Sequence, residues 1–430
     1  MNGEKTSVVL SDGFTIPSDI TLGDDNELEQ IRMYRSDGAA VTNIIIVFTE
    51  EDLKPGHKRR SFNPDMVHQI FDNEGTIYGY RNLHIDIYYL ANSAHCFVDI
   101  RYTEIINDDM LIPDPDDIIL KLSLWLPEGY STNKNMFLDR LKNENHNQMF
   151  GRVIDTVFLY NEKDKTTYEY IITLCSIDEP GFTEFHYRFQ CMIVWFIDAA
   201  SQIDADDPNW MFLYVYEKRT LDTSSTAGLY PVGFATVYKF FHFPDKIRAR
   251  ISQFFIIPSC QGMGLGTHLL KSTYKVITDL PNVVDIAVED PCPTFTRIRD
   301  ILDCQLLMEL DCFKVPQINK GFSDTMYLEA NKHYKINKKQ CQRVYEILRF
   351  SYIKCDRFSP DYAVLYKEIS HRLKIPYLKE QRCLKKIKCN PDQLSKFSHL
   401  ISLESVQKDI ACHMSEITTV AQYFLAKINK

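Results

Sequence analysis

The sequence predicts an α+β protein with a mixed N-terminal domain, a central domain of strands and helices, and a C-terminal helical domain. Three observations predict this fold. Strand-like runs separated by turns fill the first third of the chain. A strand, a glycine-rich turn, a helix and another strand follow one another over residues 251–290. Apolar residues then recur at spacings of three and four. We therefore expect a poorly ordered segment followed by three domains: 1–40, then 41–135, 136–315 and 316–430.

Composition indicates a folded, multidomain protein. A chain of 430 residues is longer than one ordinary core requires, and 45% of its residues are hydrophobic. Residues 1–5 do not resemble a signal peptide, and no apolar run approaches the roughly 20 residues of a membrane helix. The 12 cysteines show no Cys-x-x-Cys motif and no His/Cys cluster at zinc spacing. We expect reduced thiols and no metal site.

Charge is unevenly distributed along the chain. The net charge is −9, yet residues 331–389 carry 16 Lys and Arg against 5 Asp and Glu, which leaves −20 for the remainder. An acidic catalytic region suits a basic substrate better than nucleic acid. The basic stretch is open to three interpretations: a solvated helix surface, which we favour, a dock for a protein partner, or a nucleic-acid contact.

The N-terminal domain is predicted to consist mostly of strands. Residues 43–48 and 96–102 are apolar runs of strand length, and between them Leu83, Ile85, Ile87 and Tyr89 alternate with more polar positions. Nothing in this region supplies catalytic chemistry. Lys58-Arg59-Arg60 is either a weak nuclear-import patch or a solvated basic turn, and we favour the turn.

Elements of both central and C-terminal parts follow from periodicity. A long helix is predicted from about Glu184 to Ile203, because apolar residues form one stripe there: Phe185, Phe189, Met192, Ile193, Phe196 and Ile197. An acidic turn with Asp204, Asp206 and Asp207 comes next, before strands at 210–216 and 230–243. Helices of the C-terminal domain are indicated by two further groups of apolar residues, around Val344 to Leu373 and around Leu403 to Phe424.

The glycine-rich turn Gln261-Gly-Met-Gly-Leu-Gly266 predicts an anion site. Without Cβ atoms, its backbone N–H groups can approach a phosphate, and the following helix N-terminus favours negative charge. A P-loop is excluded because Gly266-Thr267-His268 lacks the lysine, and Thr267 fits a dinucleotide fingerprint poorly. A glycine-rich bend without a ligand remains the alternative.

The Gln-x-x-Gly-x-Gly pattern resembles the acetyl-CoA turn of the GNAT N-acetyltransferases. Other motifs occur around it in a specific order, and together they resemble the catalytic subunit of the type B histone acetyltransferases over roughly residues 43–390. The motifs are Trp195 to Ser201, Ile203 to Asp207, Tyr238 to Lys246, Arg250-Ile-Ser-Gln-Phe254, Ala287-Val-Glu-Asp-Pro291, Arg297-Ile-Arg-Asp300, Lys335 to Lys338 and Arg343 to Arg349.

This resemblance implies a GNAT acyl-CoA N-acyltransferase core, which has a mixed, mostly antiparallel sheet, with acetyl-CoA as cosubstrate. By the same resemblance, acetyl-CoA is bound by Phe254, Phe255, Ile256, Gln261, Gly262, Met263, Gly264, Leu265, Gly266 and Thr294. The histone peptide is contacted by Asn73, Glu74, Gly75, Tyr238, Lys239 and Phe240, with Asp206 and Asp207 near the active site. Taken alone, residues 73–75 would be only an acidic turn.

Acetyl transfer to lysine requires a general base. With a pKa near 10.4, only about one lysine in 10³ is neutral near pH 7.4, an obstacle of roughly 4 kcal/mol. Glu289, at the end of a predicted strand, is our candidate, and Asp290 and Asp198 are the others. Asp198 stands where the family has a longer glutamate. The alternatives are strand-end carboxylates that cap a turn before Pro291, and an ordinary helix-face carboxylate at Asp198.

Direct attack by the lysine amine in a ternary complex is expected, with no enzyme nucleophile, so Cys260 and Cys292 are interpreted as bystanders. The resemblance implies acetylation of free, newly made histone tails, with histone H4 as the expected target. It also implies a WD-repeat histone-binding propeller subunit as partner and a location in nucleus and cytoplasm. Two other classes stay open: a GNAT enzyme for a non-histone protein or small amine, and a catalytically silent acetyl-CoA-binding scaffold.

Overall fold

The computed structural model describes residues 7–9, 15–17, 32–54, 60–71, 75–106, 114–221, 227–387 and 402–428. The chain forms two compact units, each of several segments. The first unit comprises Met1–Pro208, Tyr214–Gly233 and Phe255–Met263, and the second comprises Asn209–Leu213, Phe234–Phe254 and Gly264–Lys430. The domain boundaries expected near residues 40, 135 and 315 remain predictions.

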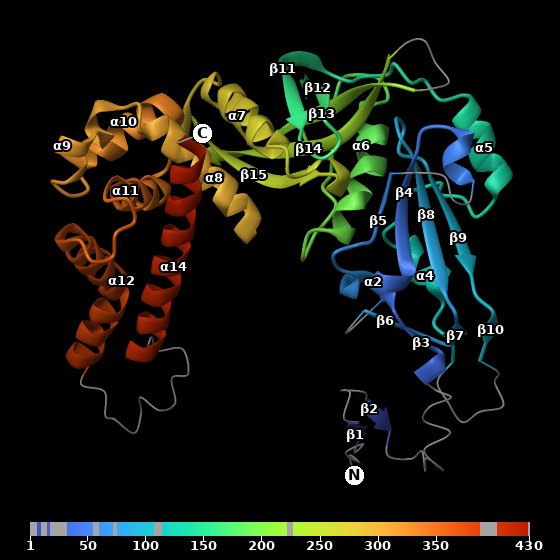
Figure 1. Ribbon diagram of the computed structural model, residues 1–430, viewed down its shortest axis with the longest axis horizontal. Coiled ribbons are helices and arrows are strands. Elements are labelled where there is room, and N and C mark those ends of the chain that lie inside the picture. Colours follow the sequence, from blue (N-terminus) through green and yellow to red (C-terminus); the bar gives the residue numbers. More distant parts are fainter. Residues whose placement is uncertain are drawn as a thin grey trace. The chain divides into compact units, whose positions relative to one another are not determined.

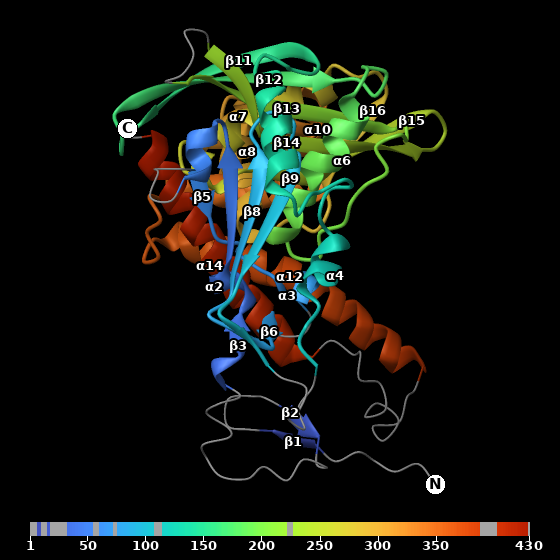
Figure 2. The same ribbon diagram turned by 90° about the vertical axis from the view of Figure 1, so that its right-hand side faces the viewer.

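A four-stranded sheet in the first unit has the strand order β5-β4-β8-β9 (Figure 1). Figure 2 shows β5, β8 and β9 of this sheet after a quarter turn. Its β-branched and aromatic residues favour extended backbone. The central pair β4 and β8 is parallel, and the outer pairs are antiparallel. The strands are β5 (Arg60–Phe62), β4 (Thr42–Val47), β8 (His84–Leu90) and β9 (Cys96–Arg101).

Strand β8 is buried on both faces, which differs from the alternation that we expected. Leu83, Ile85, Ile87 and Tyr89 are buried as predicted, but so are the intervening Asp86 and Tyr88. Asp86 tolerates burial because it accepts hydrogen bonds from Asn43, Tyr88 and Arg101. One side of the sheet packs against helix α5 (Lys134–Lys142). This cluster contains Ile45, Val47, Tyr88, Leu90, Phe97, Phe137 and Leu141.

Shorter elements surround this sheet. Residues 35–40, which we expected to be poorly ordered, instead form β3 and the start of α2, because β3 pairs with β6 and Asp37 caps the helix. Much of residues 1–31 lies outside the described residues. The shorter elements are β1 (Ser7–Val9), β2 (Thr15–Pro17), β3 (Arg35–Asp37), α2 (Gly38–Val41), η1 (Glu50–Leu53), α3 (His68–Phe71), β6 (Thr76–Tyr78), β7 (Tyr80–Arg81), β10 (Glu104–Ile105) and α4 (Ile118–Ser123).

The helix predicted from Glu184 to Ile203 is wrong in its C-terminal half. Helix α6 (Phe182–Gln190) gives way to a 3-10 turn, η2 (Cys191–Trp195). The chain then folds back, and the Gln190 side chain accepts from the Ile203 N–H and donates to the Ile203 carbonyl. Part of the predicted apolar stripe is still buried here: all five residues of η2 lie in the core, although they form a 3-10 turn instead of an α-helix.

A six-stranded mixed sheet, as predicted, has the order β11-β12-β13-β14-β15-β16. Strands β11 and β12 pair antiparallel, whereas β15 and β16 pair parallel. The strands are β11 (Arg152–Asn161), β12 (Thr166–Cys175), β13 (Trp210–Thr220), β14 (Ala227–His242), β15 (Lys246–Ile256) and β16 (Val283–Val288).

The rest of the second unit is helical beyond β16, which confirms the predicted helical C-terminal region (Figure 1). Helix α14 packs against α8, α11 and α12. Within the described ranges, no helix combines the length and apolar character that crossing a membrane requires. The elements are η3 (Pro258–Cys260, in the first unit), α7 (Leu265–Thr278), α8 (Pro293–Leu307), η4 (Asp311–Phe313), α9 (Val315–Ile318), α10 (Asp324–Tyr334), α11 (Lys338–Tyr352), α12 (Pro360–Ile387) and α14 (Leu403–Ile428).

A buried polar network joins α7, α8 and α11. Arg299 of α8 donates to the Tyr274 hydroxyl of α7 at 2.9 Å and lies 3.6 Å from the Asp303 carboxylate. Gln340 of α11 donates to Asp303 at 2.9 Å. Asp303 is fully buried, and this burial raises its pKa to about 7 despite the neighbouring Arg299. The network therefore couples the packing of these helices to the protonation of one carboxyl.

We predict that Asp303→Asn changes the pH dependence of stability. An aspartate in the unfolded chain titrates near 3.9, so the folded state binds the proton more tightly, and stability falls as pH rises from about 4 to 7. Between pH 6 and pH 8 the wild type should lose stability on the order of 1 kcal/mol from this group, and the asparagine variant should not. Thermal melting of both proteins at the two pH values tests this. Equal changes in both would contradict it.

Candidate active site

The glycine-rich turn joins the end of β15 to helix α7. Gly262 and Gly264 have φ values of 83° and 90°, in the left-handed region where a side chain is strained. A Cβ atom built on either glycine meets no described atom within 4 Å, so the space beside this turn is open. Gly266 differs, because its Cβ would make ordinary contacts with Ile298 and Phe254 at 3.5 and 3.7 Å. The backbone conformation therefore requires glycine at positions 262 and 264, but not at position 266.

The same turn fits a phosphate-bearing ligand. Gly264 is the N-cap of α7 and has no side chain to accept from the first N–H groups of the helix, which leaves these donors for an anion. Among the predicted cofactor residues of the turn, Gln261 donates its side-chain amide to the Ile256 carbonyl at 2.7 Å and so closes the turn. Leu265 is buried and Met263 half-buried, so Leu265 offers only its backbone.

Strand β15 continues beyond its pairing with β16 toward the turn. Its parallel pairing with β16 ends at Ile251 and Val288, whereas β15 itself continues to Ile256. Residues 252–256 therefore lie beyond the last residue that pairs with β16. The Gln253 N–H donates to the Thr236 hydroxyl at 3.0 Å. Of the residues predicted there, Phe255 and Ile256 are buried and Phe254 packs edge-on against Phe295 at 5.0 Å. Thr294 is exposed on the first turn of α8.

Glu289 lies where the β15–β16 pairing ends. Its N–H donates to the Ile251 carbonyl at 2.9 Å. Its carboxylate accepts a hydrogen bond from the Ser252 hydroxyl at 2.6 Å and lies 3.1 Å from the Arg250 guanidinium. The next residue, Asp290, is exposed and has a φ of 30°. Of this predicted pair, Glu289 is therefore the carboxylate that the structure holds in one place.

Asp198, the third predicted carboxylate, belongs to the first unit. It follows the 3-10 turn instead of lying on a helix face, and its Oδ1 is 3.0 Å from His68 Nε2. Its side chain is 75% exposed. The structure thus gives Asp198 a histidine partner that the sequence did not suggest.

Two of the predicted substrate segments are well formed. Tyr238 and Phe240 of β14 pack ring against ring at 4.5 Å, and the Arg250 guanidinium lies 4.3 Å from the centre of the Phe240 ring. The backbone N–H of Lys239 donates to the Asn209 carbonyl. The contact to Arg250 connects this segment to Glu289 within the second unit, which brings a predicted substrate segment and the candidate base together.

The acidic turn is organised by Asp204. Its carboxylate accepts from the Asp206 N–H and from the Tyr187 hydroxyl, each at 3.1 Å. Asp206 is exposed and Asp207 half-exposed. Of the third segment, Asn73 and Glu74 lie outside the described residues, and Gly75 is buried and accepts from the Gly38 N–H.

The cysteines near the site have structural surroundings. Burial raises the pKa of Cys260 to about 11, so its thiol is protonated at neutral pH. Cys260 lies 3.8 Å from the carboxylate of Glu217, which is fully buried and paired with Arg60 at 2.8 Å. Arg60 is therefore not part of the solvated basic turn that we favoured, and Lys58 and Arg59 lie outside the described residues. Cys292 caps α8.

Residues that sequence reasoning did not assign are Arg250 and Ser252, although both lie in the motif Arg250-Ile-Ser-Gln-Phe254. Arg250 and Ser252 are two residues apart on β15, so a strand places their side chains on the same face. This spacing was the sequence signal that could have identified them together. Within the described ranges, no group of three or more His, Cys, Asp and Glu residues is arranged to hold a metal.

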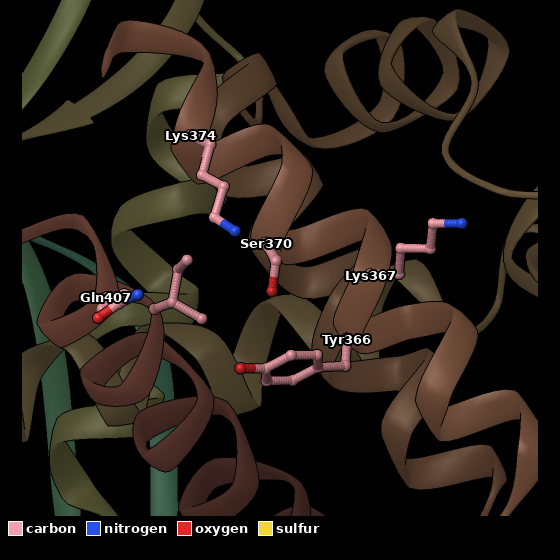
Figure 3. Close-up of a pocket in the computed structure, with 6 residues that line it drawn as sticks. Tyr366, Lys367, Ser370, Lys374 and Gln407 are labelled. Carbon is pink, nitrogen blue, oxygen red and sulfur yellow. The ribbon is translucent and has the colours of Figure 1, made fainter. Parts of the chain in front are cut away.

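A separate pocket of about 380 Å³ lies between α12 and α14 (Figure 3). It is lined by Tyr366, Lys367, Ser370, Lys374, Gln407 and Ile410. Figure 3 shows the Lys374 amine directed into the space beside Ser370 and the Lys367 amine directed away. None of these residues belongs to the predicted site.

Comparisons with known proteins match successive parts of the chain. Residues 34–198 match the model described as Histone acetyl transferase HAT1 N-terminus. Residues 177–289, which include the glycine turn and Glu289, match the Acetyltransferase (GNAT) family, whose cosubstrate is acetyl-CoA. Residues 299–350 match the model described as Histone acetyltransferase type B catalytic subunit, C-terminal.

Curated relatives carry the same description. A histone acetyltransferase type B catalytic subunit of Homo sapiens is 32% identical, over 90% of this chain and 92% of the relative. The histone acetyltransferase type B catalytic subunit of Cryptococcus neoformans is 26% identical, over 79% of this chain and 88% of the relative. A solved aminoglycoside acetyltransferase from an uncultured soil metagenomic sample is 18% identical over 28% of this chain and 78% of that one, with a TM-score of 0.21. The match to the human protein along both chains shows that this protein belongs to the family of histone acetyltransferase type B catalytic subunits.

Proposed function

We propose that this protein acetylates lysine side chains of free, newly made histone tails, with histone H4 as the expected target. The observation that carries the proposal is the position of Glu289, a held carboxylate at the end of the β15–β16 pairing, from which β15 continues toward the glycine turn. Relatives named as histone acetyltransferases support the substrate class.

In this proposal, acetyl-CoA supplies the acetyl group as a thioester. The backbone edge of residues 254–256 and the N–H groups of the turn from Gln261 to Gly266 bind and orient it, with Thr294 as a further contact. Glu289 removes a proton from the lysine ammonium, directly or through a water, so that the neutral nitrogen attacks the carbonyl carbon of the thioester. The C–N bond forms and the C–S bond breaks, and CoA leaves as a thiolate that takes up the second proton lost by the nitrogen. Asp290 and Asp198 are the other proposed carboxylates of the site.

The substrate tail is proposed to contact Tyr238, Lys239 and Phe240, and residues 73–75. The acidic turn attracts its positive charges. A WD-repeat histone-binding subunit is the proposed partner, and nucleus and cytoplasm are the proposed locations, because of the family to which the chain belongs. Mass spectrometry of histones incubated with the protein and acetyl-CoA tests the function, with spermidine in a parallel reaction. Acetylation of spermidine alone, or of neither substrate, would overturn it.

We predict that Gly264→Val weakens acetyl-CoA binding. The added side chain enters the open space where the phosphates would approach the backbone, and the loss of one charge-assisted hydrogen bond corresponds to about 10–100-fold in affinity. Calorimetry measures this directly. Gly181→Val is the matched control, because Gly181 has the same left-handed conformation at the N-cap of α6 and equally open surroundings among the described residues. Wild-type affinity in folded Gly264→Val would exclude the turn as the binding site.

Glu289→Gln is expected to lower kcat by about 10²–10⁴-fold while acetyl-CoA affinity is retained, because glutamine keeps the shape but cannot accept the proton. The residual rate should rise with pH as more lysine becomes neutral. Steady-state kinetics over a pH series check both points. If this variant keeps the wild-type rate and Asp290→Asn or Asp198→Asn does not, the base is one of the two aspartates.

Replacing Asp206 and Asp207 together by asparagine should raise KM for a basic tail peptide, more at low salt than at high salt, with little change in kcat. Salt shortens the reach of surface charges to about 8 Å at physiological ionic strength, which supplies the internal control. The matched variant Glu162→Gln with Asp178→Asn removes two exposed carboxylates elsewhere in the first unit. An unchanged KM at low salt would show that the turn plays no part in capture.

A further inference from the structure

Both carboxylate oxygens of Glu289 are held by one face of β15. Arg250 approaches Oε1 at 3.1 Å, and the Ser252 hydroxyl donates to Oε2 at 2.6 Å. Arg250 and Ser252 are two residues apart, so their side chains share a face of the strand. The Glu289 N–H is bonded to the Ile251 carbonyl between them. Backbone and carboxylate are thus fixed by three consecutive residues.

Arg250 is itself held by a row of aromatic rings. Its guanidinium lies 4.3 Å from the centre of the Phe240 ring. Phe240 packs on Tyr238 at 4.5 Å, and Tyr238 packs edge-on against Trp210 at 4.8 Å. A guanidinium is planar, so it can stack on a ring with its face and donate to a carboxylate with its edge. A lysine ammonium has no such plane.

The Arg250–Glu289 ion pair matters for the orientation of the carboxylate more than for stability. The Arg250 and Glu289 side chains are 37% and 38% exposed, and ion pairs of this exposure contribute little to stability. A carboxylate has about four acceptor positions; the Ser252 hydroxyl occupies one on Oε2, and the Arg250 guanidinium lies against Oε1 as an ion pair. The remaining positions are available for the ammonium of a substrate lysine, so Arg250 and the substrate can be bound at the same time.

We propose that Arg250 is a positioning residue: stacked on Phe240, it orients the Glu289 carboxylate toward the lysine ammonium. This inference rests on the proposed role of Glu289 as general base. It adds a function for Phe240 beyond peptide contact, since the ring fixes the plane of the guanidinium.

A double-mutant cycle tests the proposal with acetyl-CoA and a basic histone-tail peptide. Arg250→Gln should lower kcat by about 10–100-fold, as expected for a misplaced catalytic group, with unchanged KM for acetyl-CoA. In a Glu289→Gln background the same substitution should cause no further loss. Arg250→Lys keeps the charge without the planar group and should recover only part of the rate.

The matched control is Arg248→Gln. Arg248 is also on β15, and it forms the same kind of ion pair with β16, to Asp285 at 2.7 Å, without touching Glu289. It should keep the wild-type kcat. Thermal melts establish that each variant is folded, and Arg250→Lys carries the test if Arg250→Gln does not fold.

The outcomes separate this inference from the proposed function. A wild-type rate for Glu289→Gln would refute the general base itself. If Glu289→Gln is slow but Arg250→Gln costs the same factor in both backgrounds, Arg250 does not act through Glu289. Equal losses for Arg248→Gln and Arg250→Gln, or full recovery by Arg250→Lys, would likewise overturn the positioning role.

Discussion

The end of the parallel pairing between β15 and β16 is the constraint on which the candidate site depends. Two parallel strands share one hydrogen-bonded ladder, and here it stops at Ile251 and Val288 while β15 continues. The last bond fixes the backbone of Glu289. Beyond it, the edge of β15 leads directly to the glycine turn and α7. The end of this pairing therefore both holds the Glu289 carboxylate and places it next to the segment of β15 that leads to the glycine turn.

Sequence patterns within short segments predicted the individual elements of this site. The features that they did not predict depend on contacts between residues far apart in the sequence. Strand, turn, helix and strand over residues 251–290 were predictable because each depends on its own residues. The end of α6 was not, because Gln190 bonds to the backbone of Ile203, thirteen residues away in sequence. The partners of Glu289 were missed for the same reason, since the contacts from Arg250 and Ser252 require the β15–β16 register. The pattern also gave three equivalent glycines, whereas only Gly262 and Gly264 are left-handed.

The excess of basic residues in the C-terminal region has a structural use. Arg343 pairs with the buried Asp300, Arg372 with the buried Glu346, and Arg349, itself buried, with Glu368. These pairs join α8, α11 and α12, so an arginine counted as surface charge in the sequence neutralises a carboxylate between helices. Net charge along a segment therefore overstates the charge that the folded region offers to a partner.

The ion pair between Arg60 and Glu217 has a consequence for how the chain can be divided. Arg60 is supplied by β5, near the start of the chain, and Glu217 by β13 of the six-stranded sheet. A fragment cut near residue 135 would lose Arg60 and leave Glu217 with Arg219, 3.8 Å away, directly beside Cys260 at the start of the glycine turn. Because a buried charge is costly unless it is well paired, β5 from the N-terminal part of the chain helps to stabilise the strand that carries Glu217.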